Sequence, residues 1–183
     1  MLQSTLEILY LLLPAMAANM APVFATHGDW LPGLNRPIDA GLSINRHRLL
    51  GDNKTIRGLI FGILFGSIIG IIQYGLSDQS WTSAISLIDY SSAPGVIVFA
   101  AAISLGALIG DAVESLIKRR LGKTSGESWS PFDQVDFAIG ALAFAALYTP
   151  ITFSHIISAI IFIGLGSYLV SHIGVSLKIK KTI

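Results

Sequence analysis

The stretch GDAVESLIKRRLGKTSGESWSPFDQVDFAIGAL (residues 110–142) runs from an acidic residue in an apolar segment, through a basic cluster, to two acidic residues that open another apolar segment. Three carboxylates, those of Asp111, Asp133 and Asp136, therefore lie at or inside segments that are apolar enough to enter a bilayer. An ionisable side chain is costly within a membrane and generally faces a polar cavity or a partner of opposite charge. The stretch thus indicates both a membrane fold and the position of a polar site within it.

The composition extends this interpretation to the whole chain. Of its 183 residues, 52% are hydrophobic and only 13% are charged, and the mean hydropathy is +0.68; these values exclude an ordinary soluble domain. The apolar blocks are close to the ~20 residues that span a bilayer as a helix, and they cover residues 4–24, 57–76, 94–117, 136–153 and 155–177. We predict an all-α integral membrane protein with five transmembrane helices in a single transmembrane domain, residues 1–183.

The basic residues predict the orientation of these helices. All twelve Lys and Arg residues lie in three segments, after the first, third and fifth apolar blocks. They are Arg36, Arg46, Arg48, Lys54 and Arg57, then Lys118, Arg119, Arg120 and Lys123, and finally Lys178, Lys180 and Lys181. By the positive-inside rule these segments are cytoplasmic, which predicts an outside N-terminus, a cytoplasmic C-terminus and a multi-pass protein of the cell membrane.

Glycines recur at helical spacing in two of the apolar blocks. They are Gly58, Gly62, Gly66 and Gly70 in the second block, and Gly106 and Gly110 in the third. A four-residue spacing places small residues on one helix face, where a neighbouring backbone can approach closely. The second and third helices are therefore candidates for tight mutual packing, although the sequence does not show which helix is the partner of each face; this is an ordinary structural role.

Asp111 has helical neighbours that are also polar. Glu114, Ser115 and Lys118 follow it by three, four and seven residues, which places them on nearly the same face of a helix. This face either lines a polar site or holds an internal ion pair, in which Lys118 neutralises Asp111 or Glu114.

The residues after Asp111 have structural interpretations of their own. The basic run at 118–120 complements the dipole at the C-terminal end of a helix, and residues 130–133 read as a capping box that starts the fourth helix. Asp136 lies one turn after Asp133, however, and two like charges at this spacing are unfavourable unless a cation lies near them.

Three carboxylates offer hard oxygen ligands, which suit Mg²⁺ better than zinc, and the chain has no cysteine for a zinc site. Bound Mg²⁺ is commonly completed by the phosphates of a substrate. The segment Lys54-Thr55-Ile56-Arg57 adds cations, a hydroxyl and backbone N–H groups suited to phosphate. The simpler alternative for this segment is a helix start that Asp52 or Asn53 caps. On the first interpretation, a cytoplasm-facing pocket, partly within the membrane, holds a metal and a polyphosphate.

The order of these motifs resembles that of a known family. GDAVESLIKRRLGK (110–123) followed by FDQVDFAIG (132–140) is similar to the signature of the CDP-diacylglycerol synthase superfamily, and NKTIRG (53–58) resembles a Lys-Thr segment upstream in the same enzymes. The five-helix size, PAMAANMAP (14–22) and RPIDAG (36–41) are most similar to its CDP-archaeol synthase branch. The resemblance covers most of the chain. The chain departs from the diacylglycerol enzymes at one place: these carry His-Gly-Gly, whereas this chain reads ESWSPF (127–132).

The resemblance implies a membrane cytidylyltransferase that transfers CMP from CTP to an ether-linked isoprenoid (geranylgeranyl) glycerol phosphate, releasing pyrophosphate and forming CDP-archaeol in phospholipid biosynthesis. Its partners would be CTP and a lipid phosphate in the bilayer, with Mg²⁺ as cofactor and no nucleic acid. The implied metal ligands are Asp111, Asp133 and Asp136, and the implied catalytic residues are Asp111, Lys118, Asp133 and Asp136. The residues implied for the nucleotide and its phosphates are Asn19, Asn53, Lys54, Thr55, Arg57, Arg119 and Lys123.

Other classes of membrane protein remain as alternatives. An ion-coupled transporter also uses intramembrane acids and glycine-rich helices, but five helices show no obvious inverted repeat, and the charges lie at helix ends instead of the bilayer midplane. A lipid-phosphate phosphatase would need a nucleophile or a histidine pair near the basic cluster, and neither is evident. A structural membrane protein, whose charges only set its orientation, is the remaining alternative.

Overall fold

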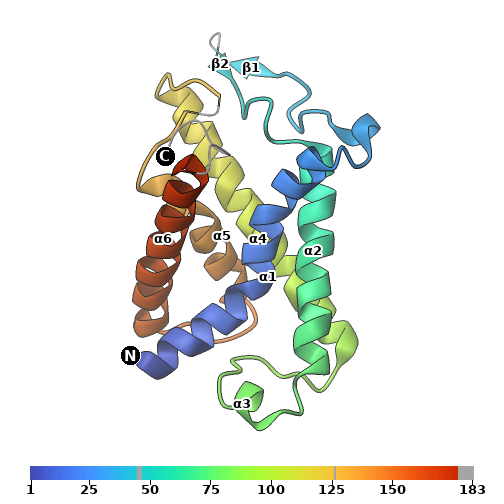
Figure 1. Cartoon of the computed structure of the whole chain (residues 1–183), viewed down its shortest axis with the longest axis vertical. Coiled ribbons are helices and arrows are strands. Elements are labelled where there is room, and N and C mark those ends of the chain that lie inside the picture. Colours follow the sequence, from blue (N-terminus) through green and yellow to red (C-terminus); the bar gives the residue numbers. More distant parts are fainter. Residues whose placement is uncertain (45–46, 126, 177–183) are drawn as a thin grey trace.

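The computed structural model describes residues 1–44, 47–125 and 127–176, and its main elements are helices (Figure 1). They are α1 (Leu2–His27), α2 (Ile56–Gly75), α3 (Ser80–Ser83), α4 (Ala93–Arg120), α5 (Asp136–Ala145) and α6 (Phe153–Ser176). Two 3-10 turns, η1 (Pro32–Leu34) and η2 (Phe132–Gln134), and an antiparallel pair of short strands, β1 (Ser43–Ile44) and β2 (His47–Arg48), lie in the loops. The all-helical membrane class that the sequence predicts is confirmed.

Within the part of the chain that the structure describes, three helices, α1, α2 and α4, are long and apolar enough to cross a membrane. With 20 residues, α2 is about 30 Å long at 1.5 Å per residue, which matches the hydrocarbon core of a bilayer. The sequence places further spans at 136–153 and 155–177; α6, with 24 residues, agrees with the second of these ranges, and α5 is shorter than the first. Helix α5 has only 10 residues, and the described side chains of α6 form an apolar helix over Phe153–Leu169.

The turn after α5, at residues 146–149, does not continue as a helix, and Pro150 accounts for this. Pro150 has no N–H to donate and disfavours a helical conformation in the residue before it. That residue, Thr149, is buried, and its hydroxyl donates to the Leu87 carbonyl oxygen at 2.7 Å. The predicted fourth span is therefore a short helix followed by an anchored non-helical segment.

Helix α1 runs through the middle of the bundle, between α2 on one side and α5 and α6 on the other (Figure 1). The N-terminus and α3 lie at one end of the bundle, and β1 and β2 lie at the other. The core forms where α1 meets α4, α5 and α6. Its buried members include Ile8, Leu11, Leu12, Ala15, Ile103, Ala107, Phe137, Ala138, Ala141, Ala159 and Ile163. The many alanines allow close helix contacts, which drive association inside a bilayer.

Glycines set the distance between α2 and its neighbours. The four on its inner face are all buried: Gly58, Gly62, Gly66 and Gly70. A methyl group on Gly66, for example, would overlap the Ser104 hydroxyl of α4 and would lie 2.9 Å from the Pro14 carbonyl oxygen of α1. The predicted packing of the second span on the third is confirmed, and α1 is a further partner of the same face.

Gly106 and Gly110 of α4 face α5 and not α2. A methyl group on Gly106 would lie 2.7 Å from the Gly140 carbonyl oxygen, and one on Gly110 would overlap the backbone of Asp136. The partner of these two glycines, which the sequence left open, is therefore α5, and they lie on a different face of α4 from Ser104.

The fourth helix begins later than the sequence predicts. Residues 130–133 do not cap it: part of this segment forms η2, and α5 begins at Asp136 without a side-chain cap. The Asp133 carboxylate accepts hydrogen bonds from the Trp129 N–H at 3.0 Å and from the Ser128 hydroxyl at 3.1 Å. Asp133 therefore closes the turn before η2 instead of capping a helix.

Filling the glycine face of α2 should destabilise the bundle. We expect Gly66→Ala to cost roughly 1–3 kcal/mol, the range for over-packing a filled interior, because its methyl group has no free space. Thermal unfolding in detergent, followed by circular dichroism, should show a lower midpoint. Gly75→Ala is the matched control, since it lies in the same helix and its methyl group would meet nothing within 4 Å. Equal midpoints for the two variants would contradict this packing.

Candidate active site

Two helices bring three carboxylates together. Asp111 and Glu114 lie one turn apart on α4, and Asp136 is the first residue of α5. One oxygen atom of each lies within 4.8 Å of the others. Close packing makes this possible, because α4 meets the backbone of Asp136 at Gly110, where any side chain would collide. The carboxylate cluster, defined as Asp111, Glu114 and Asp136, thus depends on the contact between α4 and α5.

Two lysines lie against the carboxylate cluster. The Lys54 Nζ atom, from the loop before α2, is 2.7 Å from Asp111 Oδ2, and the Lys118 Nζ atom is 3.0 Å from Glu114 Oε1. The side chains of Lys54 and Asp111 are 19% and 27% exposed, whereas Lys118 and Glu114 are buried, so the cluster opens to solvent on the Asp111 side. The expected pairing of Lys118 with Glu114 is present, and Asp111 takes its partner from a distant part of the chain.

Carboxylate oxygens at this site lack donors. Glu114 Oε1 and Asp133 Oδ1 are buried and have no hydrogen-bond partner among the described residues; for Glu114 the lysine contact is an ion pair without hydrogen-bond geometry. A buried acceptor without a donor costs ~1–3 kcal/mol. In addition, among the described residues the three carboxylates of the cluster have two cationic partners, Lys54 and Lys118. The donor set therefore fits a divalent cation, which prefers hard carboxylate oxygens.

Glu114 joins the carboxylate cluster in the place that the sequence assigns to Asp133. Asp133 lies close enough to Glu114 for their charges to interact, but its Oδ2 atom accepts hydrogen bonds from its own turn. The signal for Glu114 was its spacing of three residues from Asp111, which places the two on one helix face. From the sequence, an ion pair with Lys118 accounts for the position of Glu114 equally well. Asp133 as a metal ligand stays a prediction.

A loop with its own charge pairs follows α4. Arg119 is buried and its Nη1 donates to the Lys123 carbonyl oxygen at 2.6 Å, while Lys123 Nζ lies 2.9 Å from Glu127 Oε1. The Thr124 N–H and the Lys123 ammonium both donate to Glu127, and they lower the pKa of its carboxyl to about 2. Arg119 and Lys123 thus have partners within the chain, and their role toward a nucleotide stays a prediction.

The segment before α2 serves the helix itself. Thr55 is the N-cap of α2, where its hydroxyl accepts the Gly58 N–H at 3.0 Å. The expected cap at Asp52 or Asn53 is wrong, because only Thr55 directly precedes the first helical turn. The Thr55 hydroxyl is therefore engaged by the helix backbone, and its role toward phosphate stays a prediction.

Three further predicted residues form no hydrogen bond or ion pair with the carboxylate cluster in the described part of the chain. Arg57 is buried and donates to the Trp30 carbonyl oxygen and the Thr26 hydroxyl, both at 3.3 Å, near the end of α1. Asn53 is exposed in the loop, and Asn19 is half-buried in α1. Of the predicted basic residues, Lys54 and Lys118 are the two that contact the cluster in this part of the structure.

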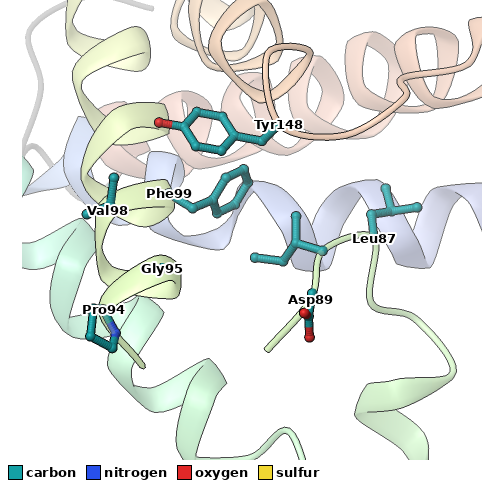
Figure 2. Close-up of a pocket in the computed structure, with 8 residues that line it drawn as sticks. Leu87, Asp89, Pro94, Gly95, Val98, Phe99 and Tyr148 are labelled. Atoms are coloured by element: carbon teal, nitrogen blue, oxygen red, sulfur yellow. The ribbon is translucent and has the colours of Figure 1, made fainter. Parts of the chain in front are cut away.

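A separate cleft lies at the other end of α4 (Figure 2). Its volume is about 480 Å³, and it is lined by Leu87, Ile88, Asp89, Pro94, Gly95, Val98, Phe99 and Tyr148. The Tyr148 ring packs edge-on against Phe99, with ring centroids 5.3 Å apart. Asp111 follows Phe99 on α4 at a distance of about 18 Å along the helix axis. None of the lining residues is basic, so the cleft lacks groups for a polyphosphate, and the candidate site is the carboxylate cluster.

Comparisons with known proteins point to one family. The profile of the CarS-like family, described as CDP-archaeol synthase, matches residues 1–183. The CDP-archaeol synthase of Methanocaldococcus jannaschii is 38% identical over 155 residues, which are 84% of this chain and 82% of the relative. That of Thermococcus kodakarensis is 41% identical over 145 residues, 79% of this chain and 75% of the relative. A solved structure, described as an intramembrane enzyme for archaeal membrane lipids biosynthesis, is 36% identical with a TM-score of 0.68, covering 90% of this chain and 91% of that one.

Removing one carboxylate should weaken cation binding. We expect the purified protein to bind Mn²⁺, a spectroscopic probe for oxygen-ligand sites, and Glu114→Gln to raise the dissociation constant roughly tenfold or more, because a neutral amide replaces a charged ligand. Electron paramagnetic resonance of free Mn²⁺ measures this constant. Asp89→Asn, at the other end of α4, is the control and should bind Mn²⁺ like the unsubstituted protein. Equal affinity in the two variants would contradict the site.

Proposed function

The chain belongs to the CDP-archaeol synthase family, and we propose that it carries out the reaction of this family at the carboxylate cluster. It is a membrane cytidylyltransferase that forms CDP-archaeol in archaeal lipid biosynthesis, by transfer of CMP from CTP to a lipid phosphate. The observation that supports this location is the meeting of three carboxylates with Lys54 and Lys118. We propose an ether-linked isoprenoid (geranylgeranyl) glycerol phosphate as the acceptor. The alternative of an ion-coupled transporter finds no support among the relatives.

The reaction needs positioning and charge neutralisation, and it needs no protein nucleophile. The lipid phosphate is already an anion at neutral pH, so one of its oxygens attacks the α-phosphorus of CTP directly. A P–O bond to the lipid phosphate forms while the bond from the α-phosphorus to the oxygen that bridges to the β-phosphate breaks. Pyrophosphate leaves with that electron pair. The task of the protein is therefore to hold two mutually repelling anions in line.

We propose that the cation at this site is Mg²⁺, held by Asp111, Glu114 and Asp136, with Asp133 near enough to contribute. The support is the set of hard oxygen donors and the buried oxygens of Glu114 and Asp133 that lack hydrogen bonds in the described part. When bound, the cation would supply charge neutralisation and Lewis-acid polarisation at phosphate oxygens.

The basic residues would bind the phosphates. Lys54 and Lys118 each contact one carboxylate, and an ammonium group has three N–H donors, so both retain donors for phosphate oxygens. Arg119 lies one residue further along α4, and its Nε atom is buried without a hydrogen-bond partner among the described residues. We propose Lys54, Lys118 and Arg119 as the main phosphate ligands. Asn19, Asn53, Thr55, Arg57 and Lys123 are further candidates for contacts with the nucleotide.

We further propose that the protein crosses the membrane five times, with the N-terminus outside and the site facing the cytoplasm. Two basic segments, 36–57 and 118–123, meet at one end of the bundle, where Arg120 Nη1 donates to the Ile44 carbonyl oxygen at 3.1 Å. The N-terminus lies at the opposite end (Figure 1). Since α5 is short, the segment 146–152 would complete its crossing. Arg46, Lys178, Lys180 and Lys181, which also bear on this orientation, lie outside the described residues.

Pyrophosphate release tests the reaction and the site. With CTP, Mg²⁺ and geranylgeranyl-ether glycerol phosphate, we expect the purified protein to release pyrophosphate, and to do so more slowly with phosphatidic acid. Asp111→Asn should lower turnover roughly 100-fold or more, because it removes a charged ligand and the partner of Lys54. Asp89→Asn is the control. Turnover by Asp111→Asn near that of the control would remove the proposed site, and no lipid-dependent release by the folded unsubstituted protein would overturn the proposed function.

Single cysteines test the orientation, because the natural chain has none. Ser43→Cys in β1 and Ser80→Cys in α3 are both at exposed positions at opposite ends of the bundle. A membrane-impermeant maleimide should label Ser80→Cys in intact cells, and Ser43→Cys only in inverted vesicles. The reverse pattern, or equal labelling of both from one side, would contradict the proposed orientation.

A further inference from the structure

The loop between α1 and α2 is built around a buried carboxylate. The Asp39 side chain is fully buried, at 0% exposed, although it lies outside the long helices. Its Oδ1 atom accepts from the Gly41 N–H at 3.0 Å and from Arg48 Nη2 at 3.1 Å, and its Oδ2 atom accepts from the Leu50 N–H at 3.0 Å. One side chain thus ties together three points of a loop that has little apolar core of its own.

This carboxylate is charged in the folded protein. Burial acts to raise the pKa of Asp39, but hydrogen bonds from Leu50 and Gly41 and the hydrogen bond and charge of Arg48 outweigh it, so the pKa is lowered. A buried charge is tolerated only with such partners, and its removal leaves donors without an acceptor. The loop therefore depends on Asp39 for its shape.

The same loop carries Lys54 to the carboxylate cluster. Ile38, the neighbour of Asp39, donates its N–H to the Lys54 carbonyl oxygen at 2.8 Å. This hydrogen bond belongs to a short antiparallel bridge between residues 37 and 55. From that bridge the Lys54 side chain reaches Asp111, with Nζ 2.7 Å from Oδ2. Asp39 and the ammonium of Lys54 are thus connected through one peptide unit and one backbone hydrogen bond.

The loop also rests on the end of α4. Gly51 has a φ of +97°, which L side chains rarely adopt. A methyl group on it would lie 3.2 Å from the Ser125 hydroxyl and 4.0 Å from Arg119 Nε. The loop is therefore held between its Asp39 centre and the basic end of α4, close to Arg119, one of the proposed phosphate ligands.

We propose that Asp39 is a positioning residue for the reaction: it holds the loop in the shape that keeps the Lys54 ammonium against the carboxylate cluster. This inference rests on the proposed function of Lys54 as a phosphate ligand. Asp39 acts through the backbone at residues 38 and 54, since its own oxygens are bound within the loop. The RPIDAG segment (36–41) thereby has a physical role.

Chemical labelling of Lys54 tests this positioning without any assay of turnover. Lys54 is paired with Asp111, so it should react slowly with acetic anhydride, as measured by mass spectrometry with Lys123 as the internal reference. Asp39→Asn should raise the Lys54 labelling rate about fivefold or more, because an amide nitrogen cannot accept the hydrogen bonds of the lost oxygen. Asp52→Asn is the matched control: it removes the exposed partner of Arg48 and should change labelling by less than about twofold.

A double-mutant cycle on kcat/KM for CTP separates positioning from a general loss of structure. Asp39→Asn should lower kcat/KM about fivefold to thirtyfold, and Lys54→Met should lower it further. The double variant should equal Lys54→Met alone, because Asp39 acts through Lys54. Additive losses would overturn the inference, and so would unchanged Lys54 labelling in Asp39→Asn.

If Asp39→Asn does not fold, Arg48→Gln replaces it in both experiments, because Arg48→Gln removes only one donor to the carboxylate and the Arg48 side chain is 32% exposed. Faster labelling of Lys54 and a non-additive loss of kcat/KM, both smaller than for Asp39→Asn, support the inference. The absence of these two effects overturns it. If Lys54→Met turns over CTP like the unsubstituted protein, the proposed phosphate role of Lys54 fails. Labelling then still decides whether Asp39 positions Lys54.

Discussion

Carboxylates at the edge of a bilayer must be neutralised, and the arrangement of this protein depends on how that is done. Asp111 and Glu114 lie in the C-terminal part of α4, and Asp136 begins α5; an unpaired charge is costly in such apolar helices. Lys118 neutralises Glu114 from the next turn of the same helix, whereas Lys54 reaches Asp111 from 57 residues away in the chain. The charge that remains is what makes the cluster suited to a divalent cation and a polyphosphate.

Close packing of small residues places these charges. Gly110 lets α4 meet the backbone of Asp136, and the glycine face of α2 lies against both α1 and α4. In a bilayer such contacts replace the hydrophobic effect as the source of helix association. The loops at the site end rely on charge instead: Asp39 organises the loop before α2, and Glu127 is bound by the loop after α4. Packed helices thus place the acids and Lys118, and a charge-paired loop brings Lys54 to them.

Much of this could be predicted from the chain itself. Hydropathy and the distribution of basic residues are local properties, so they predict a helical membrane protein. Acids inside apolar blocks are rare enough to mark a site, and Asp111 and Asp136 do lie together. The ordered motifs from NKTIRG to FDQVDFAIG also predicted the family. Lys54 was expected near the acids, although nothing in the sequence indicated that Asp111 would be its partner.

The sequence by itself determined the class of protein and its family, and it singled out most of the charged residues that meet at the carboxylate cluster, because these follow from residue types and short spacings. Only the tertiary structure decided that Glu114 joins the cluster while Asp133 closes a turn, that Gly106 faces α5, and that the helix after Asp136 is short. In the sequence, Glu114 and Asp133 look equivalent, because each lies three residues from another acid, Asp111 or Asp136. Which acids come together depends on where another helix packs, and that is set by contacts between residues far apart in the chain.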